Sequence, residues 1–71
     1  MNKEKVLEAI KEGKRVSHPN FSKEEWMKQS NIPDYYTFED GIECPQTEFW
    51  HIRDTPSWEY DWFIYGDNKD E

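Results

Sequence analysis

The chain has 71 residues, a formal net charge of −7 and one cysteine. This length allows a single domain, one cysteine excludes an internal disulfide, and no apolar run approaches the roughly 20 residues of a membrane-spanning helix. Residues 1–30 carry seven basic and five acidic side chains, whereas residues 31–71 carry two basic and eleven acidic ones. Because a surface this negative repels phosphate backbones, we expect no binding to DNA or RNA.

A domain of this size buries only about 60 % of the surface of its unfolded chain and is marginally stable alone. Cys44, His18 and His51 are too few and wrongly spaced for a structural zinc site. We therefore expect no metal and no cofactor, and we expect a homo-oligomer, either a dimer or a tetramer. Charged residues at positions 3–5 are not followed by the apolar segment of a secretion signal, which predicts a cytoplasmic protein.

The first element is predicted to be an amphipathic helix over residues 2–12. Its apolar residues, Val6, Leu7, Ala9 and Ile10, form one stripe. Asn2 is a suitable N-cap, and Gly13 is a suitable residue after the C-terminus. Residues 14–18 follow as a short, basic, extended segment.

A second helix is predicted over about 23–30. Ser22 and Glu25 have the spacing of a capping box, and Phe21 and Trp26 have the spacing of a hydrophobic staple. Ile32, Pro33 and Asp34 then predict a turn.

The middle of the chain has the pattern of a β-hairpin. Residues 35–38 are strand formers, residues 39–41 are a turn signal, and residues 42–44 are the returning strand. Pro45 suits the first turn of a further helix, predicted over about 46–53. Residues 54–57 interrupt that helix.

The last element is predicted to be a half-buried strand over residues 58–65. Trp58, Tyr60, Trp62 and Ile64 alternate with polar residues there. Residues 66–71 are predicted to be a disordered acidic tail, which leaves one compact domain over 1–65. The fold class is predicted to be α+β, a small and mainly antiparallel sheet with two or three short helices, assembled as a homo-oligomer.

Twelve side chains are aromatic, and ten of them lie between Tyr35 and Tyr65. A fully buried aromatic side chain removes roughly 150–250 Å² from water, so a core this small cannot enclose all of them. Core positions are predicted at Trp62, Ile64, Phe38 and Phe49. The remaining rings are candidates for a pocket or interface, namely Trp50, Trp58, Tyr36 and Trp26, although burial in the core is an equal alternative for them.

Arg53 is the only arginine or lysine between Lys28 and Lys69. A guanidinium binds phosphate through two parallel hydrogen bonds and also stacks on rings, so Arg53 is a candidate phosphate ligand. A salt bridge to Asp54 or Glu48 is the alternative. Lys14 and Arg15 offer further positive charge to an anionic ligand, with solvated surface positions as their alternative.

No catalytic constellation is visible in the sequence. Cys44 lacks a nucleophile signature, the three glycines form no phosphate loop, and the acidic residues from 34 to 43 have the wrong spacing for a calcium loop. We therefore expect the protein not to be an enzyme.

Both ends of the chain resemble a known class of protein. The run from Val6 to Val16, which closes with Gly13-Lys14-Arg15-Val16, resembles the opening of small phage proteins of the Thoeris anti-defense class. Phe21 corresponds to an aromatic residue that follows the first strand of that class, and residues 61–64 resemble its closing segment. Residues 22–57 are not covered by the resemblance.

Members of that class, and similar anti-CBASS sponges, are homo-oligomers that sequester cyclic nucleotide signals without cleaving them, in pockets between subunits. The resemblance implies a viral immune-evasion protein of the host cytoplasm with a small cyclic nucleotide as ligand. Rings would stack on bases and cations would hold phosphates. The candidate ligand-binding residues are Lys14, Arg15, Phe21, Trp26, Tyr36, Trp50, Arg53 and Trp58.

The acidic second half of the chain supports an alternative hypothesis. An inhibitor of a nuclease or polymerase presents carboxylates in place of DNA phosphates. In that case Glu39, Asp40 and Glu43 would bind a basic protein partner, and binding would weaken steeply with salt.

Overall fold

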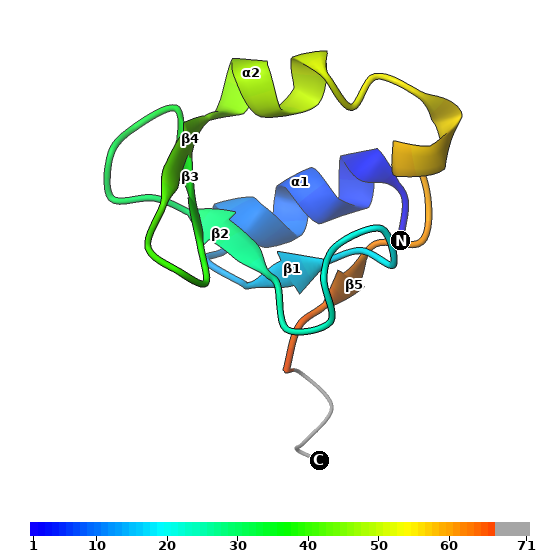
Figure 1. The fold of residues 1–71 in the computed structure, drawn as a ribbon, viewed down its shortest axis with the longest axis horizontal. Helices are drawn as coiled ribbons and strands as arrows, with labels where there is room; N and C mark the ends of the chain where they lie inside the picture. Colours follow the sequence, from blue (N-terminus) through cyan, green and yellow to red (C-terminus); the bar gives the residue numbers. More distant parts are fainter. Residues whose placement is uncertain (67–71) are drawn as a thin grey trace.

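The computed structural model describes residues 1–66 and shows an α+β fold (Figure 1). Its elements are α1 (Lys3–Lys11), β1 (Val16–Ser17), β2 (Met27–Gln29), β3 (Tyr35–Phe38), β4 (Glu43–Pro45), α2 (Gln46–His51), the 3₁₀ helix η1 (Pro56–Trp58) and β5 (Phe63–Ile64). The helix α1 packs on β1 and β2, and α2 lies beyond α1 on the side away from β1 (Figure 1). No helix in residues 1–66 is long and apolar enough to cross a membrane.

The first helix forms as predicted. The Asn2 side chain accepts a hydrogen bond from Lys5 N at 2.9 Å and thereby caps the N-terminus of α1. Gly13 follows the helix with φ +85°, the left-handed conformation that favours glycine. Val6 and Ile10 are buried on the stripe that faces the sheet.

All five strands belong to one antiparallel sheet in the order β4-β3-β2-β1-β5. Val16 in β1 lies opposite Met27 on one side and Ile64 on the other, and Met27 lies opposite Phe38. The sheet therefore brings the last strand of the chain next to the first.

The predicted hairpin is confirmed, with Tyr36 in β3 opposite Cys44 in β4. Gly41 occupies the turn with φ +87°, a conformation that the turn requires. The helix that follows is also present as α2, although it is shorter than predicted and ends at His51.

The predicted helix over 23–30 is wrong. The capping-box contact does form, because Ser22 N donates to Glu25 Oε1 at 2.9 Å, but the chain makes only one turn before it enters β2. Strand pairing on both sides gives β2 its backbone partners and buries Met27 completely. An eight-residue helix has too few internal hydrogen bonds to compete with this pairing.

The predicted strand over 58–65 is wrong at every residue except Phe63 and Ile64. Trp58 closes η1, and its carbonyl accepts a hydrogen bond from Trp62 Nε1 at 2.8 Å, so the chain turns back on itself. Asp61 has φ +76°, which no strand allows. Only Phe63–Ile64 is a strand, and Tyr60 is 60 % exposed.

The core lies between α1, the sheet and α2. Phe49 and Trp62 are its largest buried side chains, as predicted, whereas Phe38 and Ile64 are partly buried at its margin. Met27 and His18 are also buried, and the sequence did not single them out as core. The tail predicted over 66–71 lies outside the described residues from position 67 onward.

Candidate functional site

The eight predicted binding residues do not form one cluster. Phe21 is buried in the core, where its ring contacts Phe49 edge-on at 6.3 Å. Tyr36 is also a core residue, only 2 % exposed, so the structure gives it the core position that was the alternative to a pocket. Trp50 and Trp58 are partly buried against the core, Trp50 beside Tyr36 and Trp58 beside Arg53. A third group joins Arg15 to Trp26, and Lys14 forms an ion pair with Glu12 at 3.3 Å. The candidates therefore occupy several separate places on the structure.

Tyr36 and Trp50 lie in a groove between α1 and α2. We call it the helix groove, and its lining is formed by Lys3, Leu7, Tyr36, Gln46, Thr47 and Trp50 around a volume of about 370 Å³. An adjoining hollow of about 310 Å³ shares three of these residues and adds Ile10, Lys11 and Gln29. Two lysines of α1 therefore face this region of an acidic protein.

One wall of the helix groove is held by a network of hydrogen bonds. Trp50 Nε1 donates to the Tyr36 hydroxyl oxygen at 2.8 Å, which fixes the angle of the indole. Gln46 Nε2 donates to Gln29 Oε1 at 2.9 Å and to Tyr35 O at 3.2 Å. Because both protons of this amide are used on β2 and β3, its carbonyl oxygen is left as an acceptor.

Trp50 also receives a cation on its ring face. Lys3 Nζ lies 4.5 Å from the ring centroid, within the range of a cation–π interaction. Lys3 is the first residue of α1, and Leu7 follows one turn later on the same side of the helix. The sequence prediction missed Lys3 because nothing in its local pattern distinguishes it from the other lysines of α1.

Burial raises the pKa of the Tyr36 hydroxyl, while the hydrogen bond from Trp50 lowers it by a smaller amount. Tyr36 is therefore protonated at neutral pH. The helix groove thus combines the Gln46 acceptor, the Trp50 indole and the Lys3 ammonium, and the adjoining hollow adds the Lys11 ammonium.

Arg53 occupies a different place. Its guanidinium carbon lies 4.1 Å from the Phe49 ring centroid and 5.1 Å from that of Trp58, and its Nη1 donates to Phe49 O at 3.3 Å. Trp58 in turn contacts the buried His18 ring at 4.6 Å. Arg53 and Trp58 lie together, whereas Trp50 belongs to the other group.

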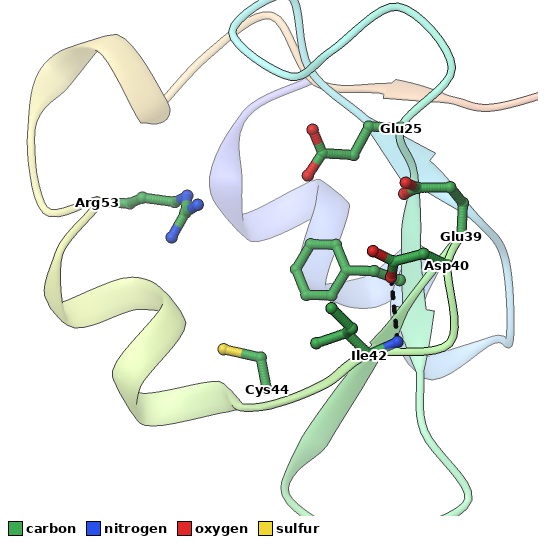
Figure 2. Close-up of a pocket in the computed structure, with 7 residues that line it drawn as sticks. Glu25, Glu39, Asp40, Ile42, Cys44 and Arg53 are labelled. Atoms are coloured by element: carbon green, nitrogen blue, oxygen red, sulfur yellow. Dashed lines mark hydrogen bonds between the residues drawn. The ribbon is translucent and has the colours of Figure 1, made fainter.

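Arg53 forms one side of a second hollow, which we call the charged pocket. It has a volume of about 280 Å³ and is lined by Glu25, Phe38, Glu39, Asp40, Ile42, Cys44 and Arg53. Figure 2 shows Arg53 on one side of this hollow and Glu25, Glu39 and Asp40 on the other. Three carboxylates at this position disfavour a phosphate, so the arrangement does not support the predicted phosphate role of Arg53.

Trp26 and Arg15 form a third group, together with Tyr65. The guanidinium carbon of Arg15 lies 5.3 Å from the Trp26 ring centroid and 5.7 Å from that of Tyr65. The Tyr65 hydroxyl donates to Glu24 Oε1 at 2.9 Å, and this bond raises the pKa of Tyr65. These contacts give both aromatic residues a structural role that the sequence pattern did not reveal.

Nucleophilic and metal chemistry have little support in residues 1–66. No group of three or more histidine, cysteine or acidic side chains there is arranged to hold a metal ion. Burial raises the pKa of the Cys44 thiol, with a further contribution from Glu48, so the reactive thiolate is disfavoured.

Comparison with known proteins gives no match to a protein-family model, to a curated protein or to a solved structure. The resemblance of the chain ends to anti-defense proteins therefore stays a prediction.

Proposed function

We propose that the protein is a phage-type immune-evasion protein that binds and sequesters a cyclic nucleotide second messenger without cleaving it. The observation that carries the proposal is the Lys3 ammonium 4.5 Å from the Trp50 ring centroid, inside a groove that also contains Gln46. A nucleotide needs a ring face for its base and a cation for its phosphate, and this groove offers both.

In this proposal the base stacks near Trp50 and displaces the Lys3 ammonium toward a phosphate. Lys11, in the adjoining hollow, neutralises a second phosphate. The free carbonyl oxygen of Gln46 accepts a hydrogen bond from the base. Every one of these groups binds, and none of them supplies a nucleophile, which agrees with sequestration rather than cleavage.

Assembly into a homo-oligomer is the second part of the proposal. Several large apolar side chains are exposed in the single chain, including Ile52 at 72 % and Tyr60 at 60 %. A second subunit that covers them would remove this apolar surface from water. Native mass spectrometry of the protein taken from cells would measure the subunit number and any retained nucleotide together.

A ligand panel tests the nucleotide proposal. Cyclic dinucleotides and cyclic ADP-ribose isomers are added singly in a thermal-shift assay, and a true ligand at 100 times its dissociation constant adds about 2.7 kcal/mol of stability. Chromatography of the released ligand should recover it intact. Absence of a shift with every member of the panel would remove the proposal.

Two lysines of α1 provide a matched pair of variants. Lys3→Gln removes the ammonium beside Trp50, whereas Lys5→Gln removes an equal charge from an exposed position outside the groove. We expect Lys3→Gln to weaken nucleotide binding about tenfold, as the loss of one charge-assisted contact implies, and Lys5→Gln to leave it nearly unchanged. If the two variants weakened nucleotide binding equally, the helix groove would not be the nucleotide-binding site.

A second candidate function is inhibition of a basic protein partner. The observation that favours it is the gathering of Glu39 and Asp40 at the charged pocket, with the exposed Glu43 at the start of β4 on the same hairpin. Binding would then fall steeply as salt rises. Replacement of these three acids should weaken binding of the basic partner more than Lys3→Gln does. The reverse ranking would exclude this second function.

A further inference from the structure

The charged pocket contains charges of opposite sign that are not paired with each other. Arg53 lies across the hollow from Glu25, Glu39 and Asp40 (Figure 2). The single ion pair within residues 1–66 joins Lys14 to Glu12, so none joins Arg53 to these carboxylates. The pocket therefore has a cationic wall and an anionic wall with a gap between them.

Arg53 is held on its own wall. Its guanidinium stacks on Phe49 and Trp58, and Nη1 is bonded to the Phe49 carbonyl. Its Nε is buried and has no hydrogen-bond partner in the described part of the chain. Moving this side chain across the pocket to an acid would break the two ring contacts, so the gap is maintained.

The anionic wall is also partly fixed. Asp40 Oδ1 accepts a hydrogen bond from Ile42 N at 3.1 Å, which orients this carboxylate at the hairpin turn (Figure 2). Glu25 Oε1 is bonded to Ser22 N, as described above. Glu39 has no hydrogen bond or ion pair within residues 1–66 and is free to close on a ligand.

Apolar groups lie in the same hollow. Phe38 is partly buried against the core, and Ile42 is 61 % exposed. Both line the pocket together with Cys44. An aliphatic chain laid over Phe38 and Ile42 removes their apolar surface from water, which favours binding.

We propose that the charged pocket binds a small zwitterion whose ammonium and carboxylate groups are separated by a short aliphatic chain. The ammonium is held by Glu39, Asp40 and Glu25, the carboxylate by the outward donors of Arg53, and the methylene groups by Phe38 and Ile42. An α-amino acid without a second charge is a poorer ligand, because only one carbon atom separates its two charged groups and it has no chain of methylene groups between them to cover Phe38 and Ile42.

Three probes of the same chain length test the proposal by isothermal titration calorimetry at low salt. They are 6-aminohexanoate, which carries both charges, hexylamine, which carries only the cation, and hexanoate, which carries only the anion. We expect 6-aminohexanoate to bind about tenfold more tightly than hexylamine or hexanoate. Each of these two probes makes a charge-assisted contact with one wall of the pocket, whereas 6-aminohexanoate makes one with both walls. Equal affinity of hexylamine and 6-aminohexanoate, or no binding of any probe, would overturn the proposal.

Variants locate the two ends of the ligand. Arg53→Gln should abolish the advantage of 6-aminohexanoate over hexylamine, while Arg53→Lys should restore part of it. The double variant Glu39→Gln/Asp40→Asn should abolish binding of both amines. Glu43→Gln is the control, since Glu43 lies on the same hairpin but does not line the pocket, and a loss of binding equal to that of the double variant would count against the site.

The pocket and the helix groove share no lining residue. Binding of 6-aminohexanoate should therefore be unchanged in Lys3→Gln and should not displace a nucleotide. This separation distinguishes failure of the zwitterion site from failure of the proposed nucleotide function.

Discussion

Three ring nitrogens in or beside the core each have a specific hydrogen-bond partner. Trp50 Nε1 is bonded to Tyr36, Trp62 Nε1 to the Trp58 carbonyl, and His18 Nε2 to the Tyr60 carbonyl. Each bond fixes a ring in one orientation. Composition alone predicted the excess of rings but not these pairings, since the partners are 4 to 42 residues apart along the chain.

His18 is bonded at both of its nitrogens. Asn20 N donates to Nδ1 at 3.0 Å, so the ring proton lies on Nε2 and is donated to Tyr60 O at 2.8 Å. We predict that His18→Phe keeps the ring contacts but destabilises the protein by about 2–3 kcal/mol, because two backbone groups lose their partner. His18→Gln, which retains one donor, should be less harmful in urea unfolding. If His18→Phe had the same free energy of unfolding as the original protein, this role of His18 would be contradicted.

Tyr36 should make the free energy of unfolding fall at alkaline pH. Burial raises its pKa in the folded state, so its contribution is complete below the unfolded value of about 10 and is lost as pH rises through the higher folded value. We predict that the free energy of unfolding falls above about pH 10, and that Tyr36→Phe makes this fall shallower. Urea unfolding at pH 8 to 11 measures the free energy of unfolding of both proteins. If it falls equally steeply with pH in Tyr36→Phe, the fall does not come from Tyr36.

Among the elements, those with local signals were the ones predicted correctly. Asn2 caps α1 and Gly41 turns the hairpin, and both act within a few residues. The segments 23–30 and 58–65 were mispredicted because distant contacts decide their conformation. Pairing with β1 and β3 draws Met27 into the sheet, and Trp62 N donates a hydrogen bond to Met1 O at 3.1 Å, at the other end of the described chain.

The exposed Lys28 in the middle of β2 distinguishes a strand from a helix at this position. Lys28 lies opposite Thr37, with its neighbour Met27 buried. We predict that Lys28→Thr is more stable than Lys28→Ala by up to about 1 kcal/mol, since threonine favours strands. A helix would give the opposite order. Thermal unfolding of the two variants side by side decides between them.

Asp61 is the residue at which the chain leaves the turn and enters β5. Its positive φ is unfavourable for a residue with a Cβ atom. We predict that Asp61→Gly is about 1 kcal/mol more stable than Asp61→Ala at the same position, because glycine adopts this conformation without strain. Equal stabilities would show that the turn relaxes in both variants.

The candidate site was predicted only in part, for a reason that lies in α2. Trp50 and Arg53 are three residues apart, a spacing that places side chains together on a continuing helix. The helix ends at His51, however, and Arg53 turns back over Phe49 while Trp50 points toward Tyr36. The pair was therefore divided between the charged pocket and the helix groove.

At the scale of the whole molecule, the dominant electrostatic feature is an excess of negative charge. The sequence has sixteen acidic residues and nine lysine or arginine residues, and residues 1–66 contain one ion pair. The excess carboxylates on such a surface repel one another, and this repulsion lowers the stability of the folded state.

Salt should therefore stabilise this protein. From 0.01 M to 0.15 M NaCl the Debye length falls from about 30 Å to about 8 Å, and the repulsion between carboxylates is screened. We predict a higher Tm at the higher salt concentration, measured by tryptophan fluorescence. A lower Tm would mean that attractive pairs outweigh the repulsion.

Three of the four tryptophans are close enough to interact as chromophores. The Trp62 ring centroid lies 5.6 Å from that of Trp50 and 5.9 Å from that of Trp58. At such separations the electronic transitions of the indoles couple, and the coupled bands overlap the peptide signal in far-ultraviolet circular dichroism. Helix content read from such a spectrum will therefore be distorted, while the same bands provide an intrinsic optical report on any event that shifts Trp50 or Trp58.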